Sequence, residues 1–282
     1  MKPEWLRVRM PTSRYMELKQ VVLTKKLSTV CQEAHCPNIS ECWSGGTATF
    51  MIMGDTCTRG CRFCNVKTGM PRPINPDEPQ LLVDAIKEIG MLKYVVITSV
   101  DRDDLPDQGA GHFAGCIDAV KEIDGIKVEV LIPDFQGKKE LLRIIMNAGP
   151  YVLAHNIETV ERLQKKVRDA RANYSQSLSV LRNAKEINPT ILTKTSIMLG
   201  LGETDEEIIQ TMNDLRNIDV DIITFGQYLR PSMKHLPVTE YVHPQKFKYF
   251  EEKAISKGFR YCASGPFVRS SYRAGELVRS LS

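Results

Sequence analysis

From residue 47 onward, short apolar runs alternate with stretches whose apolar residues recur at helical spacing. The short runs are rich in Val, Ile and Thr and have strand length, and the longer stretches suit amphipathic helices. The expected strands are Thr47–Met53, Tyr94–Val100, Lys127–Ile132, Tyr151–His155, Ile191–Leu199 and Asp221–Gln227. The expected helices are Pro79–Glu88, His112–Ile123, Lys138–Asn147, Ser177–Ile187, Asp205–Arg216 and Pro244–Lys257. This alternation predicts an α/β fold with a parallel sheet and right-handed crossovers.

Six strand–helix units are fewer than the eight of a closed barrel, so an open, partial barrel and a doubly wound sheet remain as alternatives. Residues able to do chemistry follow directly after expected strands, as Cys57 to Cys64, Asp101 to Asp104 and Asn156 with Glu158 do. Barrel enzymes build their active sites from the loops at the carboxyl ends of strands. We therefore expect a partial (β/α)6 TIM-like barrel whose loops meet at one mouth.

The two ends of the chain lack this alternation of strand and helix patterns. Residues 1–46 hold three cysteines and little strand pattern, and residues 263–282 are rich in Arg, Ser and Gly. We expect three parts: an N-terminal extension (1–46), the barrel (47–262) and a C-terminal extension (263–282). Both extensions are expected to pack on the barrel.

The overall composition is that of a soluble globular protein, with 42% hydrophobic and 26% charged residues. The chain has no apolar run of the roughly 18 residues that a membrane span needs, and no secretory signal pattern, so we expect a cytoplasmic protein without membrane contact. The net charge is a mild +4. Basic residues near the N-terminus form either a solvated face or a docking surface for an acidic protein, namely Arg7, Arg9, Arg14, Lys19, Lys25 and Lys26. Stacking aromatics are not interleaved with them, so no nucleic acid is expected.

Six of the eight cysteines lie between Cys31 and Cys64, which in a reducing compartment indicates metal ligation. The later set, Cys57, Cys61 and Cys64, has the spacing C-x-x-x-C-x-x-C. Three thiolates on one tight loop can bind three irons of a [4Fe-4S] cluster and leave the fourth iron open for chemistry. The alternative is a zinc ion with a fourth ligand elsewhere. Cys116 and Cys262 stand alone and are expected to be buried apolar residues.

The earlier set, Cys31, Cys36 and Cys42, has the spacing C-x4-C-x5-C. This wider spacing suits a separate, extended loop around a second cluster. The alternatives are stray thiols or a zinc clip.

The later cysteine set, with Phe63 before its last cysteine, resembles the signature of the radical S-adenosylmethionine superfamily. The two cysteine sets together resemble the lipoyl synthase family within that superfamily. Further segments extend the resemblance over nearly the whole chain: 46–51, 98–105, 155–160, 198–203, 225–229 with 235–238, and 265–272.

The resemblance implies two [4Fe-4S] clusters and S-adenosylmethionine as cofactors. Cys57, Cys61 and Cys64 would hold the cluster that generates a 5′-deoxyadenosyl radical. Cys31, Cys36 and Cys42 would hold a second cluster, completed by Ser271 of the segment Arg-Ser-Ser-Tyr, with Ser270 as the fallback. The implied activity is that of a sulfurtransferase, which inserts two sulfur atoms at C6 and C8 of a protein-bound octanoyl-lysine. The second cluster would supply the sulfur.

The resemblance also implies that polar groups at the strand ends hold S-adenosylmethionine. The candidates are Asp101, Asp103, Asn156, Glu158, Arg168, Arg171, Lys194 and Gln227. Asn156 suits the ribose, and Arg168 or its rival Arg171 suits the methionine carboxylate. Each of these residues could instead be a helix cap or a surface ion-pair partner.

The implied partners are an octanoylated lipoyl carrier (an H protein or an E2 lipoyl domain), a low-potential electron donor of the ferredoxin or flavodoxin type, and an iron–sulfur carrier that rebuilds the spent cluster. Two other functions stay open. One is a different radical sulfur-inserting enzyme similar to biotin synthase, and the other is a zinc-stabilised binding module without catalysis.

Overall fold

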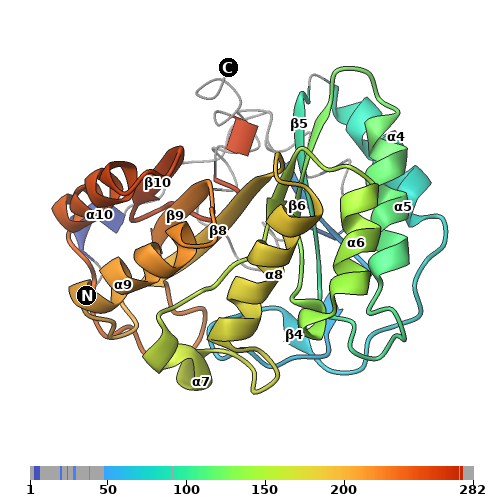
Figure 1. Ribbon diagram of the computed structural model, residues 1–282. Coiled ribbons are helices and arrows are strands. Elements are labelled where there is room, and N and C mark those ends of the chain that lie inside the picture. The colour runs from blue at the N-terminus through green and yellow to red at the C-terminus, as the bar shows by residue number, and fades with distance from the viewer. Residues whose placement is uncertain are drawn as a thin grey trace.

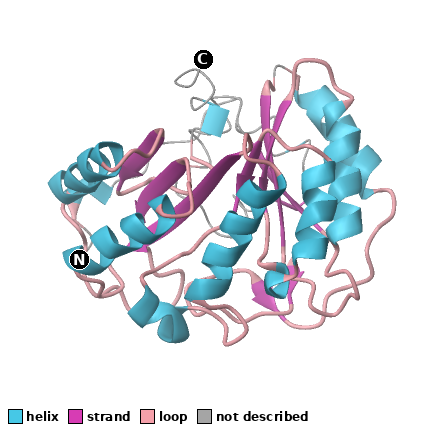
Figure 2. Cartoon of the chain, in the orientation of Figure 1, coloured by secondary structure: helices cyan, strands magenta, loops and turns pink. Residues whose placement is uncertain are grey.

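The computed structural model describes residues 3–6, 20, 24, 28–29, 38, 48–90, 92–272 and 274–275. Most of the strands form one curved sheet, and helices cover its outer face (Figures 1 and 2). The strands of this sheet are β1 (Ser28–Thr29), β2 (Ala48–Ile52), β5 (Tyr94–Ser99), β6 (Lys127–Leu131), β7 (Val152–Ala154), β8 (Leu192–Leu199), β9 (Ile222–Gln227) and β10 (Tyr261–Gly265). A separate small sheet pairs β3 (Thr56–Cys57) with β4 (Lys67–Thr68).

The helices begin and end where local chemistry favours it. The main helices are α4 (Glu78–Ile89), α5 (Ala110–Lys121), α6 (Lys139–Asn147), α8 (Tyr174–Ile187), α9 (Asp205–Arg216) and α10 (Pro244–Ser256), with a short α7 (Gln164–Val167). At the start of α9, Thr204 and Glu207 form a reciprocal capping box. The helices α4 and α10 carry proline in their first turn, where the missing N–H costs nothing.

The strand order of the main sheet decides between the two expected architectures. From β2 to β10 the strands follow one another in chain order, and each neighbouring pair is parallel. A doubly wound sheet reverses its order at a switch point. The sheet has no such reversal, and its order is linear rather than closed among the described residues. The α/β prediction with a partial barrel is therefore confirmed.

The predicted strands and helices match the observed elements within a few residues. One strand was missed: β10 adds a seventh parallel strand next to β9, across the expected boundary at residue 262. At the other edge, β1 pairs with β2 in antiparallel direction. None of the helices in the described ranges is long and apolar enough to cross a membrane.

Candidate functional site

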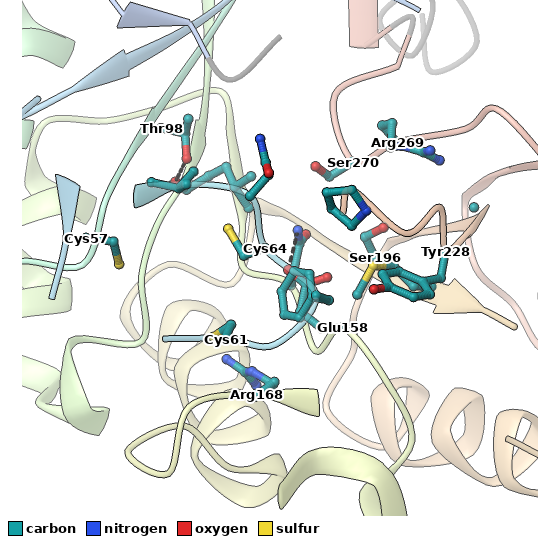
Figure 3. Close-up of a pocket in the computed structure, with 18 of the residues that line it drawn as sticks. Cys57, Cys61, Cys64, Thr98, Glu158, Arg168, Ser196, Tyr228, Arg269 and Ser270 are labelled. Carbon is teal, nitrogen blue, oxygen red and sulfur yellow. Dashed lines mark hydrogen bonds between the residues drawn. The ribbon is translucent and has the colours of Figure 1, made fainter. Parts of the chain in front are cut away.

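A cavity of about 610 Å³ lies at the carboxyl ends of the parallel strands. Its wall is formed by the loops after β2, β5, β6, β7 and β9, by residues of β8 and by the C-terminal segment 267–270. Cys57, Cys61 and Cys64 lie in this wall (Figure 3). Five of the six loops expected to meet at one mouth line the cavity, at the end where parallel barrels build active sites, whereas the loop after β8 does not line it.

The loop that carries the three cysteines begins with a turn at Met53 and Gly54, whose φ angles are 65° and 92°. A left-handed φ is uncommon for methionine, so neighbouring groups must hold this turn. The Met53 N–H donates to Glu78 Oε2 at 2.9 Å, and the Met53 carbonyl accepts a hydrogen bond from Arg102 Nη1 at 3.4 Å.

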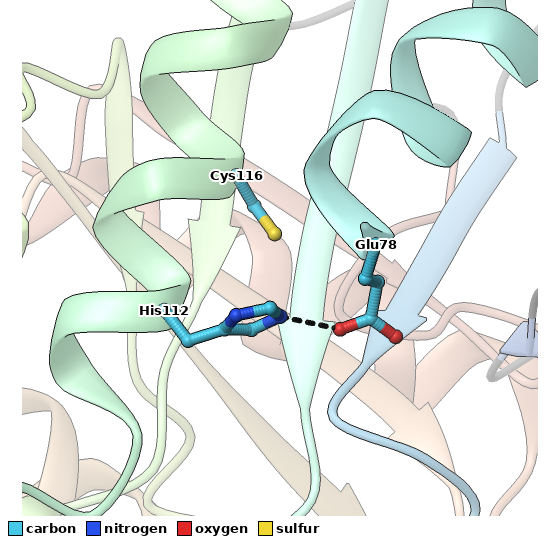
Figure 4. Close-up of side chains that lie close together, drawn as sticks. All are labelled: Glu78, His112 and Cys116. Carbon is cyan, nitrogen blue, oxygen red and sulfur yellow. Dashed lines mark hydrogen bonds and ion pairs between the residues drawn. The ribbon is translucent and has the colours of Figure 1, made fainter. Parts of the chain in front are cut away.

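Glu78 is held in turn by His112, whose Nε2 lies 2.7 Å from Glu78 Oε2 (Figure 4). Cys116 follows one helical turn later, and the three ligand-type atoms lie within 4.8 Å of one another. Burial raises the pKa of the Cys116 thiol, so the thiol stays protonated beside this pair. Glu78 and His112 satisfy each other, so we assign this cluster to holding the Met53 turn. Cys116 and Cys262 are both buried, as expected.

The three cavity thiols are partly buried and free of disulfides. Burial raises the pKa of Cys57 and Cys61 to about 12 and that of Cys64 to about 11. Without a bound group these thiols therefore stay protonated at neutral pH. Three thiolates on one loop need a strongly positive partner, which an iron–sulfur cluster supplies. The donor set and its enclosure fit the expected [4Fe-4S] cluster.

Arg59, between the first two cysteines, is a residue whose role the sequence did not reveal. Its buried guanidinium lies 3.3 Å from Asp101, 2.8 Å from Asp103 and 2.7 Å from Asp134. These carboxylates come from the loops after β5 and β6, so one side chain ties three loops together. The hydrogen bond from Arg59 lowers the pKa of Asp103 to about 2, whereas burial raises that of Asp101 to about 6.

Five of the eight candidates for S-adenosylmethionine contact line the cavity: Asp101, Asn156, Glu158, Arg168 and Gln227. The other three, Asp103, Arg171 and Lys194, are not among the lining residues. The cavity also includes Ser99, Ser196 and Tyr228, which the sequence analysis had not singled out.

Asn156 and Ser99 carry the clearest sign of a missing polar ligand. Asn156 Oδ1 and Ser99 Oγ are buried and have no hydrogen-bond partner. Buried polar atoms are normally paired, so each points to a group that arrives with a ligand. Asn156 Nδ2 donates to Glu158 Oε1 at 3.1 Å, and burial raises the pKa of Glu158. This corner of the cavity therefore fits a polar ligand such as ribose.

Arg168 lies on the cavity floor near Cys61 (Figure 3). Its Nη1 donates to Ser177 Oγ at 2.7 Å and to Gln164 Oε1 at 3.2 Å. No carboxylate within salt-bridge distance is found among the described residues. A buried guanidinium without a carboxylate partner suits an anionic ligand group.

Arg171 and Asp103 brace the cysteine loop from outside the cavity. The Arg171 Nη2 donates to the Thr58 carbonyl at 2.7 Å, and its guanidinium pairs with Asp103 at 3.2 Å and Asp169 at 2.8 Å. The Asp169 carboxylate accepts from the Gly60 N–H at 2.8 Å. Arg168 is therefore the better placed of the two rival arginines.

Lys194 lies below the cavity, inside the barrel. Its Nζ pairs with Glu129 Oε1 at 2.8 Å, and the Tyr94 hydroxyl donates to Glu129 Oε2 at 2.6 Å. Lys194 is the third residue of β8, far from the carboxyl end of the strand that faces the mouth. The structure therefore gives this candidate a buried ion pair in place of a cofactor contact.

Gln227 lies in the cavity wall, but backbone groups already occupy the hydrogen-bonding positions of its amide. Its Nε2 donates to the carbonyls of Leu199, Tyr228 and Glu240, and its Oε1 accepts from the Val242 N–H. This side chain supports the wall rather than reaching for a ligand.

His235 lies in a segment that carries the family resemblance but was not among the expected site residues. Its Nε2 donates to the Cys64 carbonyl at 2.9 Å, and its Nδ1 accepts from Ser232 Oγ at 2.9 Å. The Leu236 N–H donates to the Arg62 carbonyl at 3.2 Å. The loop after β9 thereby holds the last part of the cysteine loop.

Comparisons with known proteins agree with this geometry. A family model described as the Radical SAM superfamily matches residues 51–215. A lipoyl synthase of Anaeromyxobacter sp. (strain Fw109-5) is 58% identical over 278 residues, which cover 98% of this chain and 94% of that protein. A lipoyl synthase of Halobacterium salinarum is 60% identical over 283 residues, covering 98% of this chain and 90% of the relative. The chain belongs to the lipoyl synthase family.

A solved structure of methylornithine synthase aligns with a TM-score of 0.58 at 16% identity, covering 74% of this chain and 62% of that one. At this identity the likeness concerns the fold alone. It agrees with the open, partial barrel of this lipoyl synthase family member.

The C-terminal segment of this lipoyl synthase family member crosses the end of β9. A Cβ on Gly226 would lie 2.0 Å from the Val268 carbonyl oxygen, so only glycine allows this close approach. The segment brings Ser270 into the cavity wall, while Ser271 is not a lining residue. Cys31, Cys36 and Cys42 lie outside the described residues, as do the six basic N-terminal residues.

Proposed function

We propose that this chain inserts two sulfur atoms at C6 and C8 of an octanoyl-lysine carried by a lipoyl carrier protein. One observation carries the proposal: a single cavity has three thiols in one wall and a serine of the C-terminal segment in another. The high identity to proteins named lipoyl synthase supports it.

We assign Cys57, Cys61 and Cys64 to a [4Fe-4S] cluster. When bound, the reduced cluster and S-adenosylmethionine supply a 5′-deoxyadenosyl radical, and a second cluster supplies sulfur. Asn156 and Glu158 are assigned to the polar ribose, because Asn156 Oδ1 lacks a partner. Arg168 is assigned to the carboxylate of the methionine moiety. Asp101 closes the site next to Cys57, whose Sγ donates to it at 3.7 Å.

We assign Cys31, Cys36, Cys42 and a serine of the C-terminal segment to the second cluster. Ser271 was the expected oxygen ligand, and Ser270 is the residue that lines the cavity. The choice between them is open to a direct test, because each can be changed to alanine and the iron content measured.

The proposed partners follow from the reaction. The substrate arrives on an H protein or an E2 lipoyl domain, electrons come from a ferredoxin or flavodoxin, and an iron–sulfur carrier replaces the consumed cluster. The chain's own part is to enclose the apolar acyl chain, for which the cavity offers apolar side chains such as Leu131, Ile132 and Val268.

The decisive experiment is anaerobic turnover of an octanoyl-lysyl peptide, followed by mass spectrometry. We expect a mass gain of two sulfur atoms and two 5′-deoxyadenosine molecules per product. The variant Cys31→Ala should still cleave S-adenosylmethionine but add no sulfur, whereas Cys57→Ala should lose both. A Cys31→Ala variant that inserts sulfur normally would contradict the proposal.

A further inference from the structure

Five exposed basic residues surround the outer side of the cysteine loop, and we call them the basic rim: Arg62, Lys67, Lys165, Lys166 and Lys234. None of them forms an ion pair with a carboxylate anywhere in the described part of the chain. Unpaired charges of one sign, gathered over one surface, create a potential that attracts a partner of opposite sign.

Hydrogen bonds join the segments that carry Arg62, Lys165, Lys166 and Lys234. The Arg62 N–H donates to the Val167 carbonyl at 2.9 Å, and its guanidinium donates to the Lys166 carbonyl at 3.4 Å. The loop that carries Lys234 is attached to the cysteine loop through the bond from His235 to Cys64. Figure 1 shows β4, which carries Lys67, and α7, which carries Lys165 and Lys166, at the same end of the molecule.

The basic rim faces away from the cavity. Cys61, Phe63 and Cys64 line the cavity, but Arg62 between them does not, and neither does any other residue of the rim. A protein bound to this surface would contact Arg62, which is one residue from Cys61 and two residues from Cys64 in the sequence. It would not block the cavity itself.

Two exposed methionines flank the charges. Met70 is 82% exposed and Met233 is 83% exposed. Methionine makes adaptable apolar contacts, which suit a partner that binds and leaves quickly. Encounter complexes of electron-transfer proteins are small and depend on charge.

We propose that the basic rim is the docking surface for an acidic one-electron carrier protein of the flavodoxin class. The carrier is oxidised by one electron and the group held by Cys57, Cys61 and Cys64 is reduced by one, without a bond formed or broken in the protein. This inference rests on the proposed cluster ligation but not on the sulfur-insertion reaction.

An acidic octanoylated carrier is the competing occupant of this surface. Its acyl chain must enter the cavity, so it should cover the cavity wall, where no residue of the basic rim lies. The position of the rim outside that wall favours the electron carrier.

The test compares two variants with the same change in charge. The rim variant combines Lys67→Glu, Lys165→Glu, Lys166→Glu and Lys234→Glu. The control combines Lys87→Glu, Lys93→Glu, Arg143→Glu and Arg182→Glu, at exposed positions on other surfaces. The binding of a purified acidic flavodoxin is measured by calorimetry at low and high salt, with and without clusters in the enzyme.

We expect the rim variant to bind flavodoxin about ten-fold more weakly or worse at low salt, and the control to bind like the wild type. Flavodoxin-driven formation of 5′-deoxyadenosine should fall in parallel, while dithionite-driven formation should not change. Unchanged flavodoxin affinity in the rim variant would overturn the proposal. Weaker binding of the octanoylated carrier with unchanged flavodoxin binding would overturn it too, and would assign the rim to the carrier. Loss of sulfur insertion in the wild type, with dithionite-driven cleavage intact, would count against the proposed function alone.

Discussion

The two opposite walls of the cavity are built by different interactions. Ion pairs hold the wall that contains the cysteine loop. Arg59 pairs with three carboxylates, and Arg171 pairs with Asp103 from outside the cavity. Neutral interactions hold the wall formed by β9 and the C-terminal segment. They include hydrogen bonds of the Gln227 amide and close backbone packing at Gly226. The first wall should therefore respond to the loss of a charge, and the second wall to added volume.

The largest expected effect is on the charged wall. Arg59→Met leaves Asp101 and Asp134 without their cation, and Asp103 with Arg171 alone. Breaking a buried ion-pair network costs about 3–5 kcal/mol, so the free energy of unfolding should fall by that amount. Urea unfolding of the reduced, cluster-free chain measures it.

The matched control is Arg162→Met, which removes an exposed ion pair with Glu207. Exposed pairs contribute little, so this variant should unfold like the wild type. Equal losses in both variants would contradict the distinction between the two kinds of ion pair.

The neutral wall should be sensitive to volume instead. Gly226→Ala puts a methyl group against the Val268 carbonyl, and overpacking of this kind costs about 1–3 kcal/mol. Gly115→Ala, in α5 with nothing within 4 Å of its Cβ, should be neutral or slightly stabilising. The same unfolding measurement applies, and a Gly226→Ala variant as stable as the wild type would show that the segment moves freely.

Between the two walls, His155 should make stability depend on pH. Burial lowers its pKa from 6.5 to about 4, so below pH 6.5 the unfolded chain takes up a proton that the folded chain does not. Stability should therefore fall as the pH drops from 6.5 towards 4, by about 1.4 kcal/mol per pH unit from this group. His155→Gln should reduce that slope in urea unfolding at several pH values. An unchanged slope would assign the pH dependence to other groups.

The smallest expected effect concerns the contact between the walls. His235→Ala removes the hydrogen bond to the Cys64 carbonyl and should cost about 1 kcal/mol. Ser232→Ala leaves that bond in place and removes only its support, so its effect on unfolding should be smaller. A larger loss in Ser232→Ala would reverse the assigned order.

Much of the fold could be predicted, because buried parallel strands are continuous apolar runs separated by amphipathic helices. The strand β10 was missed since Tyr-Cys-Ala-Ser-Gly has none of the Val and Ile residues that mark the others. Its place depends on pairing with β9, which is a tertiary contact.

The candidate site was predictable where a residue follows a strand, as Asn156 and Glu158 do. It was not predictable where the direction of a side chain decides whether that side chain can reach a ligand. The Gln227 amide, for example, forms its hydrogen bonds with backbone groups. Arg59 was overlooked for a similar reason, because its three partners come from loops that lie 42 to 75 residues away in the sequence.

The buried ion pair of Lys194 and Glu129 has a consequence for where a ligand can lie in the barrel. Side chains alternate along a strand, so Glu129 and Lys194 share the inner face with Leu131 and Ser196 of the cavity wall. Together with Tyr94 they plug the barrel at the end away from the mouth. This end of the barrel is therefore filled by a buried ion pair, and a molecule bound in the cavity lies on the mouth side of that pair.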